Sequence, residues 1–473
     1  MTAAIQARGN PADKRFLGHP RGLAYLAFTE AWERFSFYGM QALLLLYMIQ
    51  HLLTPDIMGS VFGLDQFRSM VEAVTGPLSD QSFAAQVFGL YTGLVYFTPV
   101  FGGLLADRLL GQRRTVLLGA ALMALGHVLM AFESAFLMAL LLLIVGSGLL
   151  KGNISVQVGH LYGPQEEGKR SRGFVIFSAA INIGGLIGPV ICALLAQAYG
   201  WHVGFGAAGL MMLLAMAIYV AGSRYLPADV RRVRGASAGP ALTGHDWRVI
   251  AALVLVSVIA ILPSLTYNQA FISGLLMIEE SVDRQWLGRT ISTNTFNALD
   301  GLFCVILVPP LVMWWRWQAR RGREPDDLQK IAWGYLITAI ASALMVLPAM
   351  RIDSTGATVG IVWPVLLFAL NALGFLYYWP TLLALYSRAA PAAVNSTMMG
   401  VLFFSTFIGN VLSGTLAALW ETMSHARFFW LHAALAFVPF IAMLLVARPL
   451  RRLFASQPAV GTDPAANTRH VAR

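Results

Sequence analysis

The chain has 473 residues, of which 57% are hydrophobic and 12% are charged, and its mean hydropathy is +0.65. This composition excludes a soluble globular protein, because the polar residues are too few to cover an apolar core. The formal net charge is +10, but Lys and Arg form short clusters between apolar segments, which argues against a nucleic-acid-binding surface. We therefore predict an integral membrane protein, in which Cys192 and Cys304 are buried and form no disulfide.

The apolar segments predict twelve transmembrane helices, at about 20 residues per crossing. Residues 1–21 are polar and basic, and the apolar run that follows is too long for a cleaved signal peptide, so we expect a cytoplasmic N-terminal segment there. The predicted spans lie near 22–51, 82–106, 113–133, 135–160, 172–198, 202–226, 248–279, 288–316, 329–349, 357–386, 396–421 and 427–449.

A cytoplasmic linker is predicted at 227–247, which divides the spans into two six-helix bundles, 22–226 and 248–449. The tail, 450–473, is expected to be cytoplasmic and disordered. Most of the 33 Lys and Arg residues fall in the termini and in the loops after even-numbered spans, which predicts that both termini are cytoplasmic. Two such bundles are typical of a transporter with its site near the bilayer midplane.

The first span contains the charged segment "EAWERFSFYGM", with Glu30, Glu33 and Arg34. An ionised group near the bilayer centre costs about 2.5–3.5 kcal/mol, so these side chains must face protein or water. Their spacing puts them on one side of a helix, where both carboxylates can reach Arg34. Lys151 is the expected second cation.

Such a cluster has two interpretations. Burial favours a neutral acid and a neighbouring cation favours the carboxylate, so the group can exchange protons and couple that exchange to a change of shape. The alternative is a static ion-pair network, although buried ion pairs are poor stabilisers.

Further motifs follow in chain order: "YTGLVYFTPVFGGLLADRLLGQRR" (91–114), "GSGLLKGNIS" (146–155), "FSAAINIGGLIGP" (177–189), "YGWHVGF" (199–205) and "NSTMMG" (395–400). With the first span, they resemble the proton-dependent oligopeptide transporters, a branch of the major facilitator superfamily. The resemblance spans nearly the whole chain. It implies an all-α integral membrane fold of twelve transmembrane helices in two six-helix bundles.

The resemblance also implies roles for individual residues. Glu30, Glu33, Arg34 and Lys151 would form the proton-coupling cluster, and Arg34 and Lys151 would attract the carboxylate of a peptide. The residues implied in contacts with the rest of the substrate are Tyr38, Tyr96, Asn182 and Asn268. A phenol or an amide can satisfy peptide N–H and C=O groups without reading side chains, although a tyrosine in a helix can also simply pack.

The loop after the second span suggests a gate. Glycines such as Gly102 and Gly103 allow helices to approach closely, and the charged side chains of Asp107 and Arg108 can latch onto a neighbouring helix end in one conformation only. The alternative is an ordinary positive loop with a turn glycine.

Several positions depart from the family pattern. Gln41 stands where many members have an arginine, and "YNQ" (267–269) where many have a glutamate before the glutamine. More importantly, Phe375 in "NALGFLYYWP" replaces the acid that usually receives the amino terminus of the peptide, and Leu402 replaces a tryptophan. An aromatic ring offers an ammonium ion only a cation–π contact of about 0.5–2 kcal/mol.

One acid is gained, since Asp300 in "FNALDGLF" stands where the family has asparagine followed by proline. An acid within a span is a functional candidate, and we hypothesise that Asp300 takes over the contact with the amino terminus or acts as a second proton site. Alternatively, Asp300 lies at the outer end of its helix, where it is solvated or caps the helix.

The leading interpretation is a proton-coupled importer of di- and tripeptides in the bacterial inner membrane, monomeric and driven by the proton gradient without a cofactor. A second interpretation keeps the transporter but changes the cargo to a modified peptide, a siderophore-like compound or a small organic anion. The third is a sensor that binds without transport. No enzyme activity, nucleic acid or metal is expected, and His127 and His160 are interpreted as packing or interface residues.

Overall fold

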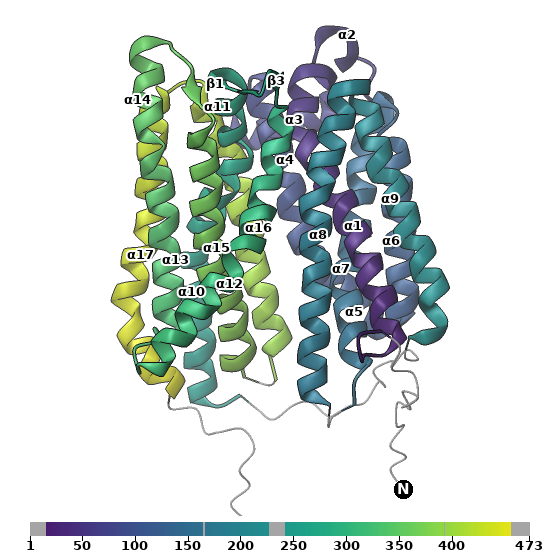
Figure 1. Ribbon diagram of the computed structural model, residues 1–473, viewed down its shortest axis with the longest axis vertical. Helices are drawn as coiled ribbons and strands as arrows, with labels where there is room; N and C mark the ends of the chain where they lie inside the picture. Colours follow the sequence, from purple (N-terminus) through teal and green to yellow (C-terminus); the bar gives the residue numbers. More distant parts are fainter. Residues whose placement is uncertain (1–15, 164–165, 227–241, 392, 456–473) are drawn as a thin grey trace, which may run out of the picture.

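The apolar segments form long helices that run between two ends of the molecule (Figure 1). The computed structural model describes residues 16–163, 166–226, 242–391 and 393–455. We call the end that carries α3 and the β2–β3 hairpin the hairpin end, and the end from which the first helix starts the linker end. The helices fall into two groups, called here the first half and the second half, which stand side by side in Figure 1.

Within the described residues, the first half contains nine α-helices and four 3₁₀- or π-helical turns. They are α1 (Arg21–Tyr47), the π-helical turn η1 (Met48–Leu52), α2 (Pro55–Met58), α3 (Leu64–Thr75), α4 (Asp80–Phe97), α5 (Pro99–Leu105), the π-helical turn η2 (Ala106–Leu110), α6 (Gln112–Leu129), the 3₁₀ turn η3 (Glu133–Ala135), α7 (Phe136–His160), α8 (Glu167–Tyr199), α9 (Trp201–Gly222) and the 3₁₀ turn η4 (Ser223–Tyr225).

The second half begins with α10 (Gly244–Asn268), the 3₁₀ turn η5 (Gln269–Phe271) and α11 (Ser273–Ser281). It continues with the short strands β1 (Val282–Asp283), β2 (Gln285–Trp286) and β3 (Arg289–Thr290), and the 3₁₀ turn η6 (Thr293–Asn297). The remaining elements are α12 (Ala298–Arg320), α13 (Asp327–Leu344), α14 (Val346–Thr355), β4 (Val359–Gly360), α15 (Val362–Ala389), α16 (Asn395–Ala417), the 3₁₀ turn η7 (Ala418–Trp420) and α17 (His425–Ala455). Strand β1 pairs in parallel with β4, and β2 pairs in antiparallel with β3.

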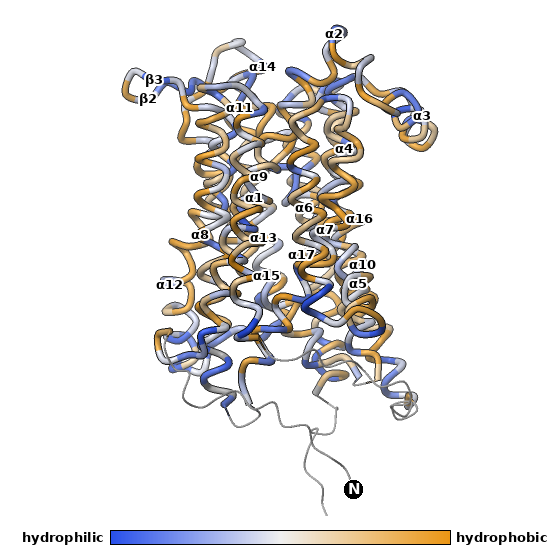
Figure 2. The backbone as a smooth tube through the Cα atoms, turned by 90° about the vertical axis from the view of Figure 1, so that its right-hand side faces the viewer, coloured by the Kyte–Doolittle hydropathy of each residue, from blue (hydrophilic) through white to orange (hydrophobic). Residues whose placement is uncertain are grey.

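The hydropathy of these helices fits a membrane environment. Within the described residues, ten helical segments are long and apolar enough to cross a membrane, and Figure 2 shows hydrophobic residues along the middle of the molecule and hydrophilic residues gathered near its ends. The two other long helices are α1, which contains Arg21, Glu30, Glu33 and Arg34, and α6, which has two arginines in its first turn. The predicted all-α membrane fold is confirmed, and the arrangement is consistent with twelve crossings.

Some predicted boundaries were wrong. The eighth span was predicted to begin at 288, but α12 begins at Ala298, because Leu287 and Gly288 adopt positive φ angles of 49° and 75° and turn the chain into the β2–β3 hairpin. The predicted loop 52–81 contains α2 and α3. In the predicted tail, α17 continues to Ala455, and 456–473 lie outside the described residues. Similarly, α10 already begins at Gly244 within the predicted linker.

The two halves touch near the hairpin end, where α4 packs against α16. Ser79 and Ser82 donate hydrogen bonds to Oε1 of Glu421 at 2.6 and 3.3 Å. Further along α4, a Cβ on Gly89 would lie 2.5 Å from the carbonyl oxygen of Asn410, so a larger residue does not fit between the helices. These contacts hold the halves together on the hairpin side of the molecule's middle.

Close packing of α1 on α8 depends on a second glycine. A Cβ on Gly184 would lie 2.1 Å from the carbonyl oxygen of Ala31 and 2.9 Å from Cβ of Arg34. We therefore expect Gly184→Ala to destabilise the protein by about 1–3 kcal/mol through overpacking, measured as a lower Tm of the detergent-purified protein. Gly152→Ala in α7 is the matched control, because a Cβ there meets no atom within 4 Å. Equal Tm values for the two variants would contradict this account of the α1–α8 contact.

Candidate functional site

A cavity of about 170 Å³ lies between the two halves. Helices α1, α4 and α8 line it from the first half, and α10, α12, α15 and α16 line it from the second. Its wall combines aromatic rings with amides and a single carboxylate, contributed by Tyr38, Gln41, Tyr96, Asn182, Tyr267, Asn268, Asn297, Asp300, Phe375, Trp379 and Asn410 among others. Such a site can hold a small molecule that has both polar and apolar groups.

The charged residues of α1 form a buried cluster beside this cavity. Nε of Arg34 lies 3.1 Å from Oε1 of Glu30 and 2.5 Å from Oε2 of Glu33, and its Nη2 donates to Oε1 of Glu33 at 2.8 Å. The three residues are between 0% and 2% exposed. The spacing in the sequence predicted that both carboxylates reach Arg34, and they do.

The two carboxylates are held unequally. Both oxygens of Glu33 contact the guanidinium. By contrast, Glu30 contacts it through Oε1 alone. In the described part of the chain neither Oε2 has a hydrogen-bond partner, but that of Glu33 faces Nε of Arg34 while that of Glu30 has no ion-pair contact. Glu30 is therefore held by fewer contacts than Glu33, and a buried oxygen without a partner is costly to leave charged.

Lys151 lies near this cluster but is not ion-paired with it. Within residues 16–163, 166–226, 242–391 and 393–455, no carboxylate oxygen lies within 4.0 Å of its ammonium nitrogen, which instead sits 5.4 Å from the ring centroid of Phe37 and 4.6 Å from that of Tyr96. The guanidinium carbon of Arg34 is 5.3 Å from the same Phe37 ring and 6.0 Å from that of Tyr38. Aromatic rings thus separate both cations from the cavity, whose lining includes neither.

From the second half, Asp300 presents a carboxylate to the cavity from the first turn of α12. Its Oδ2 accepts a hydrogen bond from the hydroxyl of Tyr267 at 2.8 Å, and its Oδ1 is buried with no hydrogen-bond partner among the described residues. Phe375 stacks on the Tyr267 ring at 4.9 Å between centroids and on Trp379 at 6.2 Å. Asp300 therefore has one free oxygen beside a stack of aromatic rings in the cavity wall.

Asn182 and Asn268, which were also predicted to contact the substrate, differ in how many hydrogen bonds their side chains already make. Asn182 lines the cavity, and its side chain makes no hydrogen bond within the part of the chain that the structure describes. Asn268 also lines the cavity, but its amide nitrogen already donates to Ser413 at 2.8 Å and is 3.5 Å from the hydroxyl of Thr92. Asn268 thus links the two halves and has only its oxygen left for a ligand.

The predicted gate residues lie at the linker end, in and beside η2. Gly102 packs closely, since a Cβ there would lie 2.1 Å from the carbonyl oxygen of Gly148, whereas a Cβ on Gly103 would meet no atom within 4 Å. The expectation of close packing was therefore wrong for Gly103 in this conformation. Asp107 and Arg108 are exposed, and neither forms an ion pair with any described residue.

Sequence reasoning missed several polar or aromatic residues of the wall, among them Trp379, Asn297 and Asn410. Asn410 lies within α16, and an amide inside an apolar segment is a signal that could have singled it out. Asn297 lies in the 3₁₀ turn η6, inside the region that the sequence assigned to a continuous span.

Comparison with known proteins gives a consistent result. A sequence profile described as the POT family matches residues 113–231 and 242–431. A protein of Lactococcus lactis subsp. lactis (strain IL1403), named a di-/tripeptide transporter, is 30% identical and covers 94% of this chain and 98% of its own length. A peptide transporter of Yersinia enterocolitica is 28% identical, with coverage of 94% and 97%.

A solved structure is similar along nearly the whole chain. It is a crystal structure of a mutant of the peptide transporter POT in complex with alafosfalin, which has a TM-score of 0.81, 26% identity and coverage of 94% of this chain and 98% of that one. The fold of this chain is therefore shared with that solved peptide transporter.

Proposed function

Because the chain belongs to the POT family of transporters, we propose that it is a proton-coupled symporter that imports di- and tripeptides by alternating access. The chain is a multi-pass membrane protein, and its function is transport and not catalysis. The observation that carries the proposal is the cavity between the halves, which has a carboxylate with a free oxygen in its wall and a buried carboxylate–guanidinium cluster beside it.

The cavity wall suits the two charged ends of a short peptide. Asp300 can receive the ammonium group through its free Oδ1, while Arg34 and Lys151 provide positive charge beyond Phe37, Tyr38 and Tyr96 to attract the carboxylate. Asn182 and Asn410 can serve the peptide bond, since an amide both donates and accepts. In this scheme, the polar residues bind the peptide backbone and its termini, and the aromatic wall contacts the side chains of the peptide.

The proton has a defined place in this scheme. We assign it first to Glu30, because that carboxylate makes fewer contacts with Arg34 and has an oxygen with no hydrogen-bond or ion-pair contact among the described residues. Protonation leaves Glu33 and Arg34 as a neutral pair, which lowers the electrostatic cost of closing the site around the substrate. Release of the proton on the other side of the membrane restores the original charge and resets the cycle.

The hairpin end is assigned to the outside of the cell membrane and both termini to the cytoplasm, because Lys and Arg concentrate toward the linker end. With this orientation, the contacts of Ser79 and Ser82 with Glu421 close the outer side. Asp107 and Arg108, free at the inner side, would form the latch that holds the opposite, outward-open conformation. We expect a monomer that needs no cofactor.

The test is uptake into proteoliposomes under an inward proton gradient, with a panel of radiolabelled dipeptides and tripeptides. We expect accumulation that collapses when a protonophore dissipates the gradient, and none in protein-free liposomes. If no peptide accumulates with the gradient in place, the proposed cargo is wrong.

A second cargo is favoured by one observation, the aromatic surface of Phe375 stacked between Tyr267 and Trp379. This surface suits a modified peptide, a siderophore-like compound or a small organic anion without a free amino group. Competition separates the two cases: a free dipeptide is expected to inhibit uptake more strongly than its N-acetylated form, and the reverse order would favour the second cargo.

A further inference from the structure

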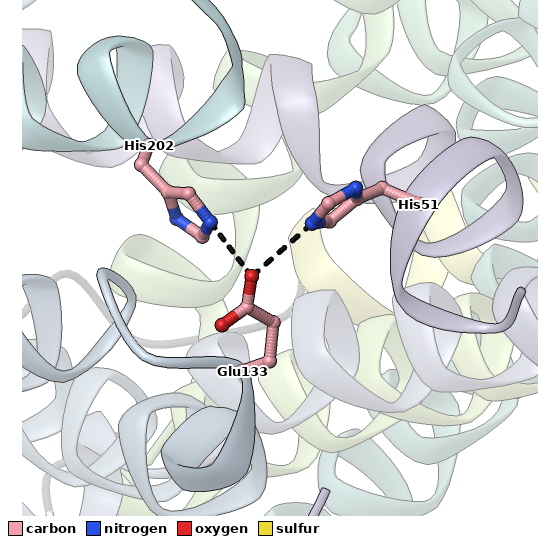
Figure 3. A group of neighbouring side chains, drawn as sticks. All are labelled: His51, Glu133 and His202. Carbon is pink, nitrogen blue, oxygen red and sulfur yellow. Dashed lines mark hydrogen bonds and ion pairs between the residues drawn. The ribbon is translucent and has the colours of Figure 1, made fainter. Parts of the chain in front are cut away.

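A cluster of two histidines and a glutamate lies away from the cavity, near the hairpin end of the first half (Figure 3). His51 comes from the π-helical turn η1 after α1, Glu133 from η3 between α6 and α7, and His202 from the first turn of α9. Oε1 of Glu133 lies 3.2 Å from Nε2 of His51 and 2.9 Å from Nε2 of His202. In the sequence these partners are separated by 82 and 69 residues, so no local motif reveals them.

The hydrogen bonding of His202 points to a ligand within the cluster. Its Nδ1 is 3.3 Å from the carbonyl oxygen of Met130, and its Nε2 faces the Glu133 carboxylate. A neutral imidazole carries only one N–H and cannot donate to both acceptors, whereas an imidazolium can. A cation among the three side chains satisfies both nitrogens, because Nδ1–H donates to the carbonyl while the lone pair of Nε2 binds the ion. Metal-bound histidines usually hold this orientation through such a hydrogen bond.

The dimensions of the cluster suit a small divalent ion. Zinc binds imidazole nitrogen and carboxylate oxygen at about 2.0–2.2 Å in a tetrahedral arrangement, which places neighbouring ligand atoms about 3.3 Å apart. The separations of 2.9 and 3.2 Å are close to this value, and the ligand atoms of all three residues lie within 4.8 Å of one another. Two imidazoles and one carboxylate suit zinc better than magnesium or calcium, which prefer oxygen ligands only.

The side chains are also accessible. Those of His51, Glu133 and His202 are 29%, 31% and 38% exposed, so an ion can enter from solvent and a water molecule can complete its coordination. Tyr47 packs its ring against both histidines, at centroid distances of 5.4 and 6.2 Å, and so limits their movement.

We propose that His51, Glu133 and His202 form a zinc-binding site that ties the end of α1 to α9 and to the α6–α7 connection. Zinc bound there stabilises the folded first half, because the three ligands come together only in the folded chain. The site does not contact the cavity, and the proposal is independent of the cargo.

The first test is isothermal titration of the purified full-length chain, with its affinity tag removed, using Zn²⁺. We expect one tightly bound ion and a loss of affinity on the order of 100-fold in His51→Gln and in His202→Gln, since each removes one ligand. The matched control is His160→Gln, because His160 is exposed at the linker end of α7 and its loss should leave the affinity unchanged.

The second test is thermal unfolding of the same proteins. Zn²⁺ in about 100-fold excess over its Kd is expected to raise the Tm of the wild-type chain by a few degrees, and EDTA should reverse the rise; Mg²⁺ should have no effect. Glu133→Gln keeps the shape of the side chain and tests the carboxylate if either histidine variant folds poorly. The proposal is overturned if Zn²⁺ does not bind, or if it binds and stabilises the three ligand variants as it does the wild type.

Discussion

Glu30→Gln is expected to abolish proton-driven accumulation of substrate, down to the level of protein-free vesicles, while exchange of substrate without a gradient persists. The amide cannot bind the transported proton, yet it resembles the protonated acid in shape. The protein should still fold, because Arg34 keeps both of its contacts with Glu33, and the single lost contact costs about 1.5–3 kcal/mol. Uptake and counterflow in proteoliposomes measure the two activities separately.

Glu72→Gln provides a chemically matched control for this result. Glu72 also forms an i, i+4 pair with an arginine, Arg68, on α3, where the pair is partly exposed and such pairs contribute little. Its replacement should leave both uptake and exchange intact. Gradient-driven accumulation that survives in Glu30→Gln would exclude Glu30 as an obligatory proton carrier and would direct attention to Glu33 or Asp300.

Asp300→Asn is expected to weaken the binding of free dipeptides by roughly 10- to 100-fold, which corresponds to the ~1.5–3 kcal/mol of a hydrogen bond to a charged group. An N-acetylated dipeptide should be unaffected, because it has no ammonium ion to pair. The variant keeps an oxygen that can accept from the Tyr267 hydroxyl, so the stacking of Phe375 should remain. The KM values of the two substrates in the same vesicles measure the difference.

A second substitution tests whether Asp300 on α12 takes the role of the family's acid, whose position on α15 is occupied by Phe375. Phe375 lies next to Tyr267, the hydrogen-bond partner of Asp300, so Phe375→Glu in the Asp300→Asn background returns a carboxylate to the same part of the cavity. We expect partial recovery of affinity for the free dipeptide. Asp283→Asn, at an exposed position of strand β1, should change nothing. An equal loss for free and acetylated dipeptides in Asp300→Asn would instead assign Asp300 a structural role.

Asp300 lies in the cavity wall, and the α1 cluster lies beside the cavity, behind the rings of Phe37 and Tyr38. The cluster of Glu30, Glu33 and Arg34 belongs to the first half and Asp300 to the second, and the halves meet through α8 and α12, where Gly301 approaches Gly185. A substrate that spans the cavity would therefore link the two halves electrostatically. This arrangement connects occupancy of the cavity to the relative position of the halves.

The amino-acid sequence by itself determined the membrane class, the series of apolar segments and the charged motif of α1. These features are local: hydropathy is a property of a continuous segment, and residues at i, i+3 and i+4 lie on the same side of a helix whatever surrounds it. That is why the pairing of Arg34 with Glu30 and Glu33 could be predicted. The resemblance to a transporter family could also be recognised from the sequence, because the motifs that carry it are short continuous segments.

Only the tertiary structure decided which distant residues meet. Lys151 was expected to pair with the carboxylates of α1, but the packing of α7 places its ammonium group on the rings of Phe37 and Tyr96. The contact of Asp300 with Tyr267 and the gathering of His51, Glu133 and His202 depend in the same way on how the helices pack. Hydropathy specifies that a segment crosses the membrane, but not its rotation or its neighbours, and these fix the geometry of every site described above.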